Sequence, residues 1–437
     1  MANLNINRRG FMQKAAAAVS VPYLVPGAAL GADGGVAASE RITCGSIGVG
    51  SQGNSLLRRF LRFDTAQFVA VCDPYENKRE SAAKKIETWY AGKAQKGSYQ
   101  GCKVYNDFRE LIGRRDVDAV VIASPGHWHA IQAVSAIEAG KDLYSEKPLS
   151  VTIAEGQAMC RAVRRHRRVF QTGTHMRSIP NVRLAGELVQ NGYLGKVHTV
   201  EVACPGGREA PTEKAVPPPP ELDYETWVGP APMIPYTPHR CDRLFGWMHC
   251  YNFVVGWISG WGVHYMDLTL FGLGGDNSGP IAVEGTAVFP KAGLNDTPIS
   301  WNVQYTMADG LKIKYANNDN PYPQGVCFKG DKGWVHTSGG KLKAGPDSLL
   351  KVAIKPDEKH LYDSKNHLGN FLECVRSRRD PVAPVEAGHA ATTLCNIADV
   401  AIRLKRKVTW DPVAGSFVDD DQANRMRSRA MRSPWTI

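Results

Sequence analysis

Hydrophobic and polar positions follow two different periods along this chain. Between residues 41 and 172, short apolar runs at 42–49, 68–72 and 119–123 take turns with stretches whose apolar residues recur every three or four positions. Continuous apolar runs are typical of buried parallel strands, and the longer spacing is typical of helices that bury one face. The pattern therefore predicts an open parallel sheet with helices on both faces.

Six further segments continue this alternation. We expect strands at residues 102–105, 142–145 and 169–172, and helices at residues 108–114, 130–137 and 153–166. Helices between successive strands supply the crossover connections that parallel strands require. A sheet of this kind binds its ligand beyond the carboxyl ends of its strands.

The period changes after residue 174. A helical stretch over 182–189 ends near Gly192 and Gly195, and strand-like segments follow at 197–202, 281–289, 299–307, 311–316, 326–329 and 333–337. The sequence Ala308-Asp309-Gly310 is typical of a hairpin turn between two of these strands. These features predict a second, α+β domain with a mainly antiparallel sheet.

A glycine-rich turn follows the first predicted strand. It reads Gly48-Val49-Gly50-Ser51-Gln52-Gly53, and Asp73 ends the next strand, 20 residues after Gly53. The glycines permit a tight turn and the close approach of a pyrophosphate to a helix N-terminus, and the acid can bind both ribose hydroxyls. The predicted fold class is therefore α/β, a Rossmann doubly wound sheet followed by the α+β domain.

The nature of the dinucleotide depends on the charge beside the ribose. The carboxylate of Asp73 would repel a 2′-phosphate, which favours NAD over NADP. Lys78 and Arg79 follow closely in the sequence and can partly neutralise that acid. We therefore predict NAD and leave NADP possible.

The patterns divide the chain into four parts. We expect a leader at residues 1–32, a dinucleotide-binding domain at 40–175, a substrate and oligomerisation domain at 176–370, and a C-terminal helix and arm at 371–437 that pack back on the domain interface. A long insertion at 205–253, with prolines at 217–220, interrupts the second domain. Such a loop is either a lid or an arm.

Composition and charge exclude several classes of protein. The 437 residues are 43% hydrophobic and 22% charged, close to the globular average, which argues against a disordered chain. The net charge of +11 is spread along the chain and lacks interleaved aromatic residues, so we predict no nucleic-acid partner. The ten cysteines show no metal-binding spacing, so we predict buried thiols and no metal.

The N-terminus resembles a twin-arginine export signal. Arg8-Arg9-Gly10-Phe11-Met12 precedes an apolar run at 15–25 and a zone of small residues that ends near Ala32. The run is too short to span a membrane, and no later stretch approaches the length of about 18 apolar residues that a span needs. We expect export to the periplasm and no membrane span.

Two motifs at predicted strand ends resemble those of the Gfo/Idh/MocA oxidoreductases. The segments are Ser124-Pro125-Gly126-His127-Trp128-His129 and Glu146-Lys147-Pro148, which match the (T/S)P…H segment and the EKP signature of that family. The resemblance covers nearly all the chain after the leader, including runs at 370–381 and 404–412. It implies NAD(P)-dependent chemistry on a sugar or cyclitol.

The resemblance also implies two catalytic residues, Lys147 and His264. Lys147 would take the hydroxyl proton and steady the alkoxide, and His264 would relay the proton. The family presents its histidine in a D-x-x-x-H pattern, and here the acid's position is Gly260. This departure weakens the prediction of simple polyol dehydrogenase chemistry. Asp267, three residues after His264, can share a helix face with it or cap the helix.

The remaining candidate residues lie at the predicted strand ends or near the histidine. Those assigned to the cofactor are Gly48, Gly50, Ser51, Gln52, Gly53, Asp73, Ser124, Pro125, His129, Glu146 and Lys147. Those assigned to the substrate are His175, Arg177, Tyr251, Trp257 and Asp267. Tyr251 and Trp257 either stack on a sugar ring or belong to the core.

Three functions remain open on these observations. The first is an oxidoreductase that moves a hydride between nicotinamide and a hydroxyl carbon of a sugar, cyclitol or glycoside. The second is a glycosidase or lyase that keeps NAD bound through oxidation, elimination and reduction, which suits an exported protein without a soluble NAD pool. A non-catalytic nucleotide-binding protein is disfavoured because Lys147 and His264 are both present. We also expect a homo-oligomer, since the second-domain sheet often forms a dimer contact in the family.

Overall fold

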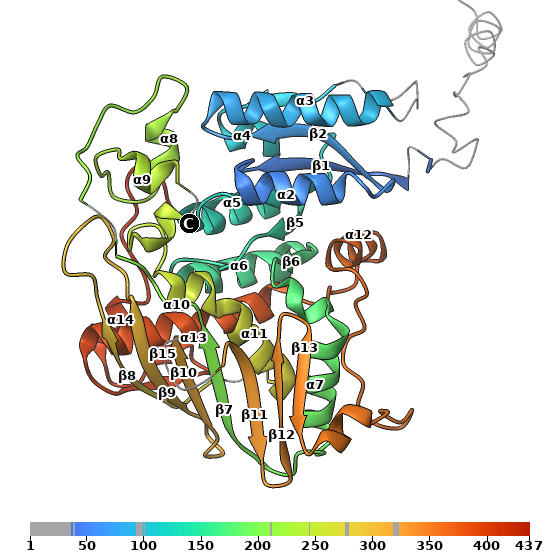
Figure 1. The fold of residues 1–437 in the computed structure, drawn as a ribbon. Helices are drawn as coiled ribbons and strands as arrows, with labels where there is room; N and C mark the ends of the chain where they lie inside the picture. Colours follow the sequence, from blue (N-terminus) through green and yellow to red (C-terminus); the bar gives the residue numbers. More distant parts are fainter. Residues whose placement is uncertain are drawn as a thin grey trace, which may run out of the picture.

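The computed structural model describes residues 36–37, 40–92, 99, 101–209, 212–243, 245–275, 279–317 and 323–437. The expected leader at 1–32 lies outside these residues. Figure 1 shows two sheets, one above the other, with the C-terminal part of the chain running between them.

The first sheet is parallel throughout. Its strands are β1 (Ile42–Ile47), β2 (Ala66–Cys72), β3 (Lys103–Tyr105), β4 (Ala119–Ile122), β5 (Asp142–Ser145) and β6 (Phe170–Thr172). They lie in the order β3-β2-β1-β4-β5-β6, with the order reversing between β1 and β4. The predicted doubly wound sheet is confirmed, and the reversal marks the crevice where such sheets bind ligands.

Helices cover both faces of this sheet. On one face lie α2 (Ser51–Phe60), α3 (Glu76–Gly92) and α12 (His367–Ser377). On the other face lie α4 (Phe108–Ile112), α5 (Gly126–Glu138) and α6 (Ile153–His166). Because α12 comes from the end of the chain, the C-terminal part completes the core of the N-terminal domain.

Helix α6 illustrates how local sequence defines an element. The hydroxyl of Thr152 accepts a hydrogen bond from the backbone N–H of Glu155, and the Glu155 side chain accepts one from the Thr152 N–H. This capping box satisfies two N–H groups that a helix start leaves without partners. The predicted start at residue 153 is therefore confirmed by the cap itself.

The second sheet has nine strands within the described residues. The strands are β7 (Val197–Cys204), β8 (Ala282–Val288), β9 (Ser300–Thr306), β10 (Lys312–Asn317), β11 (Gly325–Gly330), β12 (Gly333–Ser338), β13 (Lys341–Gly345), β14 (Val408–Asp411) and β15 (Ser416–Phe417). Their order is β13-β12-β11-β7-β10-β9-β8-β14-β15. The mainly antiparallel sheet is confirmed.

One pair of strands departs from the antiparallel rule. Strands β7 and β10 pair in parallel, with Ile313 opposite Val200. The connection between them contains the insertion, two helices and two further strands, so the chain has ample length to return in the same direction. The sequence patterns missed β13, β14 and β15, which are short or come from beyond residue 400.

Helices α7 (Pro180–Gln190), α11 (Gly262–Leu273) and α13 (Val385–Leu404) share one core with this sheet. Helix α11 is buried along almost its whole length, from Gly262 to Gly272. A helix that is buried on all sides lies in the middle of a domain, where close packing leaves its side chains little room to move. His264 and Asp267 are therefore held in rigid positions.

From residue 221 onward the insertion packs against the first domain, whereas residues 212–220 are mostly exposed. It contains α8 (Tyr224–Val228), α9 (Pro238–Cys241) and a 3₁₀ helix at Gly246–His249. Its apolar residues form a cluster with Tyr75, which follows β2. Figure 1 shows α8 and α9 beside the dinucleotide-binding domain.

The last residues of the chain secure this arrangement. Trp435 packs edge-on against Trp128 of α5, with ring centroids 4.7 Å apart. Arg432 donates a 2.9 Å hydrogen bond to the carbonyl of Gly229 in the insertion. The C-terminus thus lies beside α5 and the insertion (Figure 1). None of the helices in the described part combines the length and apolar composition that crossing a bilayer requires.

Candidate active site

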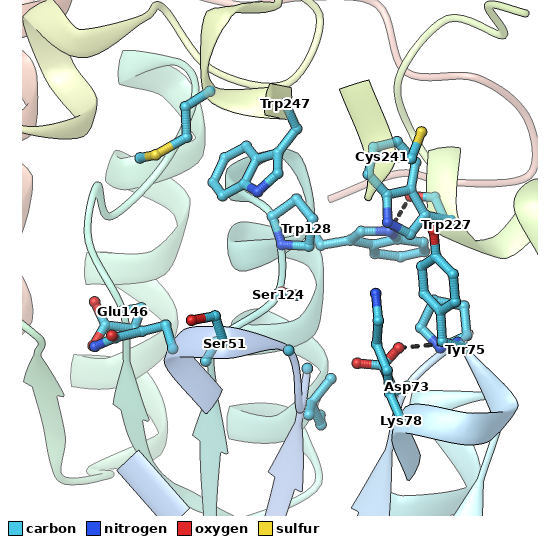
Figure 2. A pocket seen from close by; sticks show the side chains of 18 of the residues that line it. Ser51, Asp73, Tyr75, Lys78, Ser124, Trp128, Glu146, Trp227, Cys241 and Trp247 are labelled. Atoms are coloured by element: carbon cyan, nitrogen blue, oxygen red, sulfur yellow. Dashed lines mark hydrogen bonds between the residues drawn. The ribbon is translucent and has the colours of Figure 1, made fainter. Parts of the chain in front are cut away.

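A pocket of about 630 Å³ lies at the carboxyl end of the parallel sheet. Both domains and the insertion contribute to its walls. Figure 2 shows Asp73, Tyr75 and Lys78 at one end, Glu146 at the other and Ser51 between them. The lining residues that the sequence predicted are Gly48, Gly50, Ser51, Gln52, Asp73, Ser124, Pro125, Glu146, Lys147, His175, Trp257 and His264.

The glycine-rich turn has the shape that a dinucleotide needs. Gly48 has a φ of +79°, and a Cβ there would lie 2.5 Å from the backbone nitrogen of Ser124. A Cβ on Gly53 would lie 1.9 Å from the Gly48 carbonyl oxygen, so this glycine lets α2 start against the turn. Gly50 has no neighbouring atom within 4 Å of its Cβ position. The open side at Gly50 and the N-terminus of α2 form a cradle that fits a pyrophosphate.

Asp73 lies at the ribose end of this cradle. Its carboxylate accepts hydrogen bonds from the backbone N–H of Val49 at 2.8 Å and of Tyr75 at 2.9 Å. Burial raises the pKa of Asp73, and the two N–H groups oppose that rise. The bonds orient the carboxylate toward the pocket, which is the arrangement that recognises ribose hydroxyls.

The Ser-Pro…His segment lies beside the glycine-rich turn, because it follows β4, the neighbour of β1 in the sheet. Ser124 and Pro125 line the pocket, and the Ser124 hydroxyl donates to Gln132 at 2.7 Å. His129 lies outside the lining, with its ring nitrogens 2.8 Å from the carbonyl oxygens of Ser124 and Pro148. Burial lowers the pKa of His129. His129 thus connects this segment to the Glu-Lys-Pro motif instead of touching the pocket.

Glu146 points into the pocket beside the glycine-rich turn. Its carboxylate accepts a 2.8 Å hydrogen bond from the Gln52 amide and a 3.2 Å bond from the Lys147 backbone N–H. Burial raises the pKa of Glu146, and the charge of Lys147 opposes this. The glutamate therefore links the turn to the lysine that follows it.

Lys147 reaches from the first domain into the second. Its Nζ donates a 2.7 Å hydrogen bond to the backbone carbonyl of Gly260, at the end of α10 (Trp257–Gly260). Burial lowers the pKa of the ammonium, and the neighbouring Glu146 opposes that shift. A lysine with a lowered pKa can lose its proton more readily and act as a base.

Two histidines stand close to Lys147 in the pocket. The rings of His175 and His264 meet edge to face, with centroids 5.3 Å apart. Burial lowers the pKa of His264 well below its usual value, and Lys147 and His175 lower it further. His264 is therefore neutral near pH 7, and its buried Nδ1 has no hydrogen-bond partner among the described residues.

Arg177 and Asp267 lie next to this group but outside the pocket lining. The Arg177 Nε donates a 2.8 Å hydrogen bond to Asp267, with the two side chains 1% and 0% exposed. Arg177 lies in a 3₁₀ helix at His175–Ser178 that packs on α7, α11 and α12, so it meets Asp267 of α11 in a buried position. Their position corresponds to a structural ion pair and gives no support to the predicted substrate contact.

Tyr251 also lies outside the pocket lining. Its ring has the guanidinium groups of Arg403 and Arg429 at 3.6 and 3.7 Å from the centroid. Because the ring already binds two cations of the protein, it is not available to stack on a sugar. Of the two residues predicted to stack on a sugar ring, Trp257 is the one that lines the pocket. Its indole N–H donates a 2.7 Å hydrogen bond to His249.

Several lining residues were missed by the sequence patterns. They come from the insertion and from the start of α11, and include Asp242, Arg243, Phe245, Trp247, Met248 and Trp261. The Trp261 ring centroid lies 6.0 Å from the Lys147 Nζ, and its indole N–H is buried without a hydrogen-bond partner in the described part. The only signal in the sequence was the density of aromatic residues in 224–261, which does not say which wall they form.

Comparison with known proteins places the chain in a family. Residues 42–174 match the model described as "Oxidoreductase family, NAD-binding Rossmann fold". Residues 188–437 match "Oxidoreductase family, C-terminal alpha/beta domain".

Curated relatives and solved structures agree with this placement. The chain is 31% identical over 169 residues to an alpha-N-acetylgalactosaminidase of Shewanella oneidensis. This alignment covers 35% of this chain and 35% of the relative. The chain is 30% identical over 189 residues to an inositol 2-dehydrogenase of Salmonella paratyphi B, covering 43% of this chain and 52% of the relative. The matches with the glycosyl hydrolase family 109 relatives span about a third of their length.

Among solved structures, the WlbA dehydrogenase of Chromobacterium violaceum, in complex with NADH and UDP-GlcNAcA, has a TM-score of 0.63 at 17% identity. The alignment covers 85% of this chain and 96% of that one, and at this identity the likeness concerns the fold. The two family models together span nearly all the described residues, and the cradle fits an NAD pyrophosphate. The chain is a member of the Gfo/Idh/MocA oxidoreductase family, with an NAD-binding Rossmann domain.

Proposed function

We propose that this protein is an NAD(P)-dependent oxidoreductase acting on a hydroxyl-bearing carbon of a sugar, cyclitol or glycoside. One observation carries the proposal: Lys147, His175 and His264 meet in the pocket that also contains the glycine-rich turn and Asp73. Relatives named as inositol 2-dehydrogenase and alpha-N-acetylgalactosaminidase act on carbohydrates, which supports the substrate class.

NAD, held by the glycine-rich turn and Asp73, would supply the hydride acceptor. In this proposal the neutral amine of Lys147 takes the proton from the substrate hydroxyl as the carbinol C–H bond breaks. The ammonium so formed lies beside the oxygen that has lost its proton and stabilises its partial charge. His264, neutral because of its burial, accepts a hydrogen bond from the substrate or passes the proton on.

A second candidate is a glycosidase that uses retained NAD. Oxidation of one ring hydroxyl acidifies the neighbouring C–H, elimination releases the aglycone, and water addition followed by reduction gives the free sugar with no net change in the nucleotide. Two observations favour this candidate. The insertion supplies a wall along the nucleotide end of the pocket, and several relatives are named as glycosyl hydrolase family 109 proteins.

Incubation of the purified protein with NAD and a panel of sugars, cyclitols and aryl glycosides tests these proposals. Accumulation of NADH supports net dehydrogenation, and release of the aglycone without NADH supports the cycle. Lys147→Ala serves as the control, since it removes the proposed base and leaves the glycine-rich turn intact. If the wild type binds NAD but changes no member of the panel, the proposed substrate class is contradicted.

We also propose export through the twin-arginine route, on the basis of Arg8-Arg9 and the apolar run that follows. Replacing both arginines by lysine should trap the precursor in the cell, and normal appearance of that variant in the periplasm would contradict the proposal. The expected homo-oligomer stays a prediction, which light scattering of the purified protein can test.

A further inference from the structure

The insertion brings a second carboxylate to the nucleotide end of the pocket. Asp242 follows α9 and lines the pocket together with Asp73, Tyr75 and Lys78. Each of its carboxylate oxygens accepts a hydrogen bond from a tyrosine hydroxyl, one from Tyr75 and one from Tyr236. Two phenolic donors on one carboxylate hold it in place.

Tyr75 belongs to the same loop as the ribose-binding acid. Its backbone N–H donates to Asp73 at 2.9 Å, while its hydroxyl binds Asp242. Figure 2 shows Tyr75 between Asp73 and the Cys241 region of the insertion. Tyr75 therefore connects the carboxylate of Asp73, at the ribose end of the pocket, to the carboxylate of Asp242 in the insertion.

Lys78 is one of three basic residues that could favour a 2′-phosphate here. The others are Arg79, which donates to the Asp73 backbone carbonyl at 3.2 Å, and Arg243, which lines the pocket. The Nζ of Lys78 lies 3.3 Å from the centroid of the Tyr75 ring. Burial lowers the pKa of Lys78, and the charges of Asp73 and Asp242 oppose that shift. The ammonium thus interacts with two carboxylates instead of one. The net charge around it is therefore less positive, which weakens its attraction for a phosphate.

Backbone bonds hold the neighbouring part of the insertion against the same loop. The N–H of Glu76 donates to the Glu221 carbonyl at 2.9 Å, and the N–H of Asp223 donates to the Pro74 carbonyl at 3.1 Å. The Asn106 amide donates to the Asp223 carboxylate at 2.7 Å. These bonds keep residues 221–223 in place, and the Asp242 contacts add a second attachment of the insertion to the same loop.

We propose that Asp242 is a second determinant of cofactor choice and a latch on the bound nucleotide. Its charge adds to that of Asp73 against the 2′-phosphate of NADP. Its bond to Tyr75 holds the insertion over the nucleotide end of the pocket and slows nucleotide release, while its bond to Tyr236 lies within the insertion and positions the carboxylate for that contact. The inference concerns nucleotide binding alone and does not depend on the proposed carbohydrate chemistry.

Two substitutions separate the charge from the latch. Asp242→Asn removes the charge and weakens both tyrosine bonds, whereas Tyr75→Phe removes the bond between the first domain and the insertion and keeps the carboxylate. Glu209→Gln is the matched control, because it removes one acid from an exposed position of the same insertion. The dissociation constants of NADH and NADPH and the NADH dissociation rate are measured by nicotinamide fluorescence with purified protein and no carbohydrate.

We expect Asp242→Asn to lower the dissociation constant of NADPH relative to that of NADH by about tenfold and to raise the NADH dissociation rate. Tyr75→Phe should speed release and leave the ratio of the NADH and NADPH dissociation constants unchanged, and Glu209→Gln should match the wild type. An unchanged ratio in Asp242→Asn overturns the role in cofactor choice. Unchanged release in both variants overturns the latch. If Asp242→Asn does not fold, Asp242→Ser is subjected to the same two criteria.

Discussion

The ammonium of Lys147 donates a 2.7 Å hydrogen bond to the backbone carbonyl of Gly260. This bond joins the Glu-Lys-Pro motif of the first domain to α10 of the second. Gly260 is also the position at which the D-x-x-x-H pattern would place an acid. A Cβ on Gly260 would lie 2.8 Å from the Cε of Met248, so a methyl group from the insertion occupies the direction that a side chain would take.

This relationship defines the environment of the proposed base. A carbonyl dipole and an apolar methyl group replace the full negative charge that an acid would bring. A dipole stabilises an ammonium less than a carboxylate does, so burial can keep the pKa of Lys147 lowered. The absence of the acid therefore favours a lysine that is able to accept a proton.

Replacement of Lys147 by alanine should remove turnover and leave NAD binding largely intact. The groups expected to hold the pyrophosphate and the ribose are those of the glycine-rich turn and Asp73, while the amine acts on the oxygen that loses its proton. We expect a loss of about 10²–10⁴ in kcat. Lys147→Arg keeps the positive charge but cannot act as a base near neutral pH, so it should be almost as inactive.

Steady-state kinetics combined with NAD titration provides the measurement. His264→Ala should lose less activity than Lys147→Ala, because the lysine or a water molecule can still take the proton. Activity of Lys147→Ala close to that of the wild type would refute the proposed base. Loss of NAD binding in that variant would instead assign the lysine to the cofactor site.

Activity should rise with pH as Lys147 loses its proton. Because burial lowers its pKa below the usual 10.5, the rising limb of kcat/KM should lie below that value. Glu146 favours the charged lysine, so Glu146→Gln should lower the lysine pKa further and move the limb to lower pH. A pH profile of kcat/KM for both proteins tests this, and a limb that moves to higher pH in the variant contradicts it.

Introduction of an acid at residue 260 should have the opposite effect. In Gly260→Asp the new carboxylate lies near the lysine and favours the ammonium, so the lysine pKa rises and the limb moves to higher pH. The Met248 methyl must shift to make room, which it can do as the end of a flexible side chain. Gly260→Ala is the matched control, because it makes the same steric contact without charge. Equal pH profiles for the two variants would contradict the electrostatic explanation.

Replacement of Asp267 by asparagine should reduce stability more than it changes chemistry. The substitution removes the negative charge that faces the buried guanidinium of Arg177 at 2.8 Å. Loss of one partner of a buried ion pair typically costs about 3–5 kcal/mol of the free energy of unfolding. Denaturant unfolding of the wild type and the variant provides the measurement.

Glu373→Gln is the comparison for this experiment. Glu373 pairs with Arg379 at 3.0 Å, but both side chains are more than 60% exposed. An exposed pair contributes at most about 1 kcal/mol, so this variant should unfold almost as the wild type does. An Asp267→Asn variant of normal stability that has lost turnover would restore the predicted role of Asp267 in substrate binding.

The sequence by itself determined the parallel sheet and the cofactor end of the site. Gly48–Gly53, Asp73, Ser124–Pro125 and Glu146–Lys147 all follow strands that local patterns predict. Parallel strands have their carboxyl ends at one edge of the sheet. Once the strands are predicted, the residues that follow them are therefore predicted to lie together at that edge. The same reasoning could not order the strands of the second sheet. There β10 pairs with β9 in an antiparallel way and with β7 in parallel, and the parallel neighbour comes from a distant part of the sequence.

Only the tertiary structure decided which residues complete the site and which belong to the core. The ion pair of Arg177 with Asp267 joins residues 90 positions apart, and Tyr251 is enclosed by arginines from positions 403 and 429. Likewise, Asp242 and Met248 reach the pocket because the insertion folds back on the first domain. Each of these contacts depends on packing between segments that are remote in the sequence, and local periodicity carries no information about such packing.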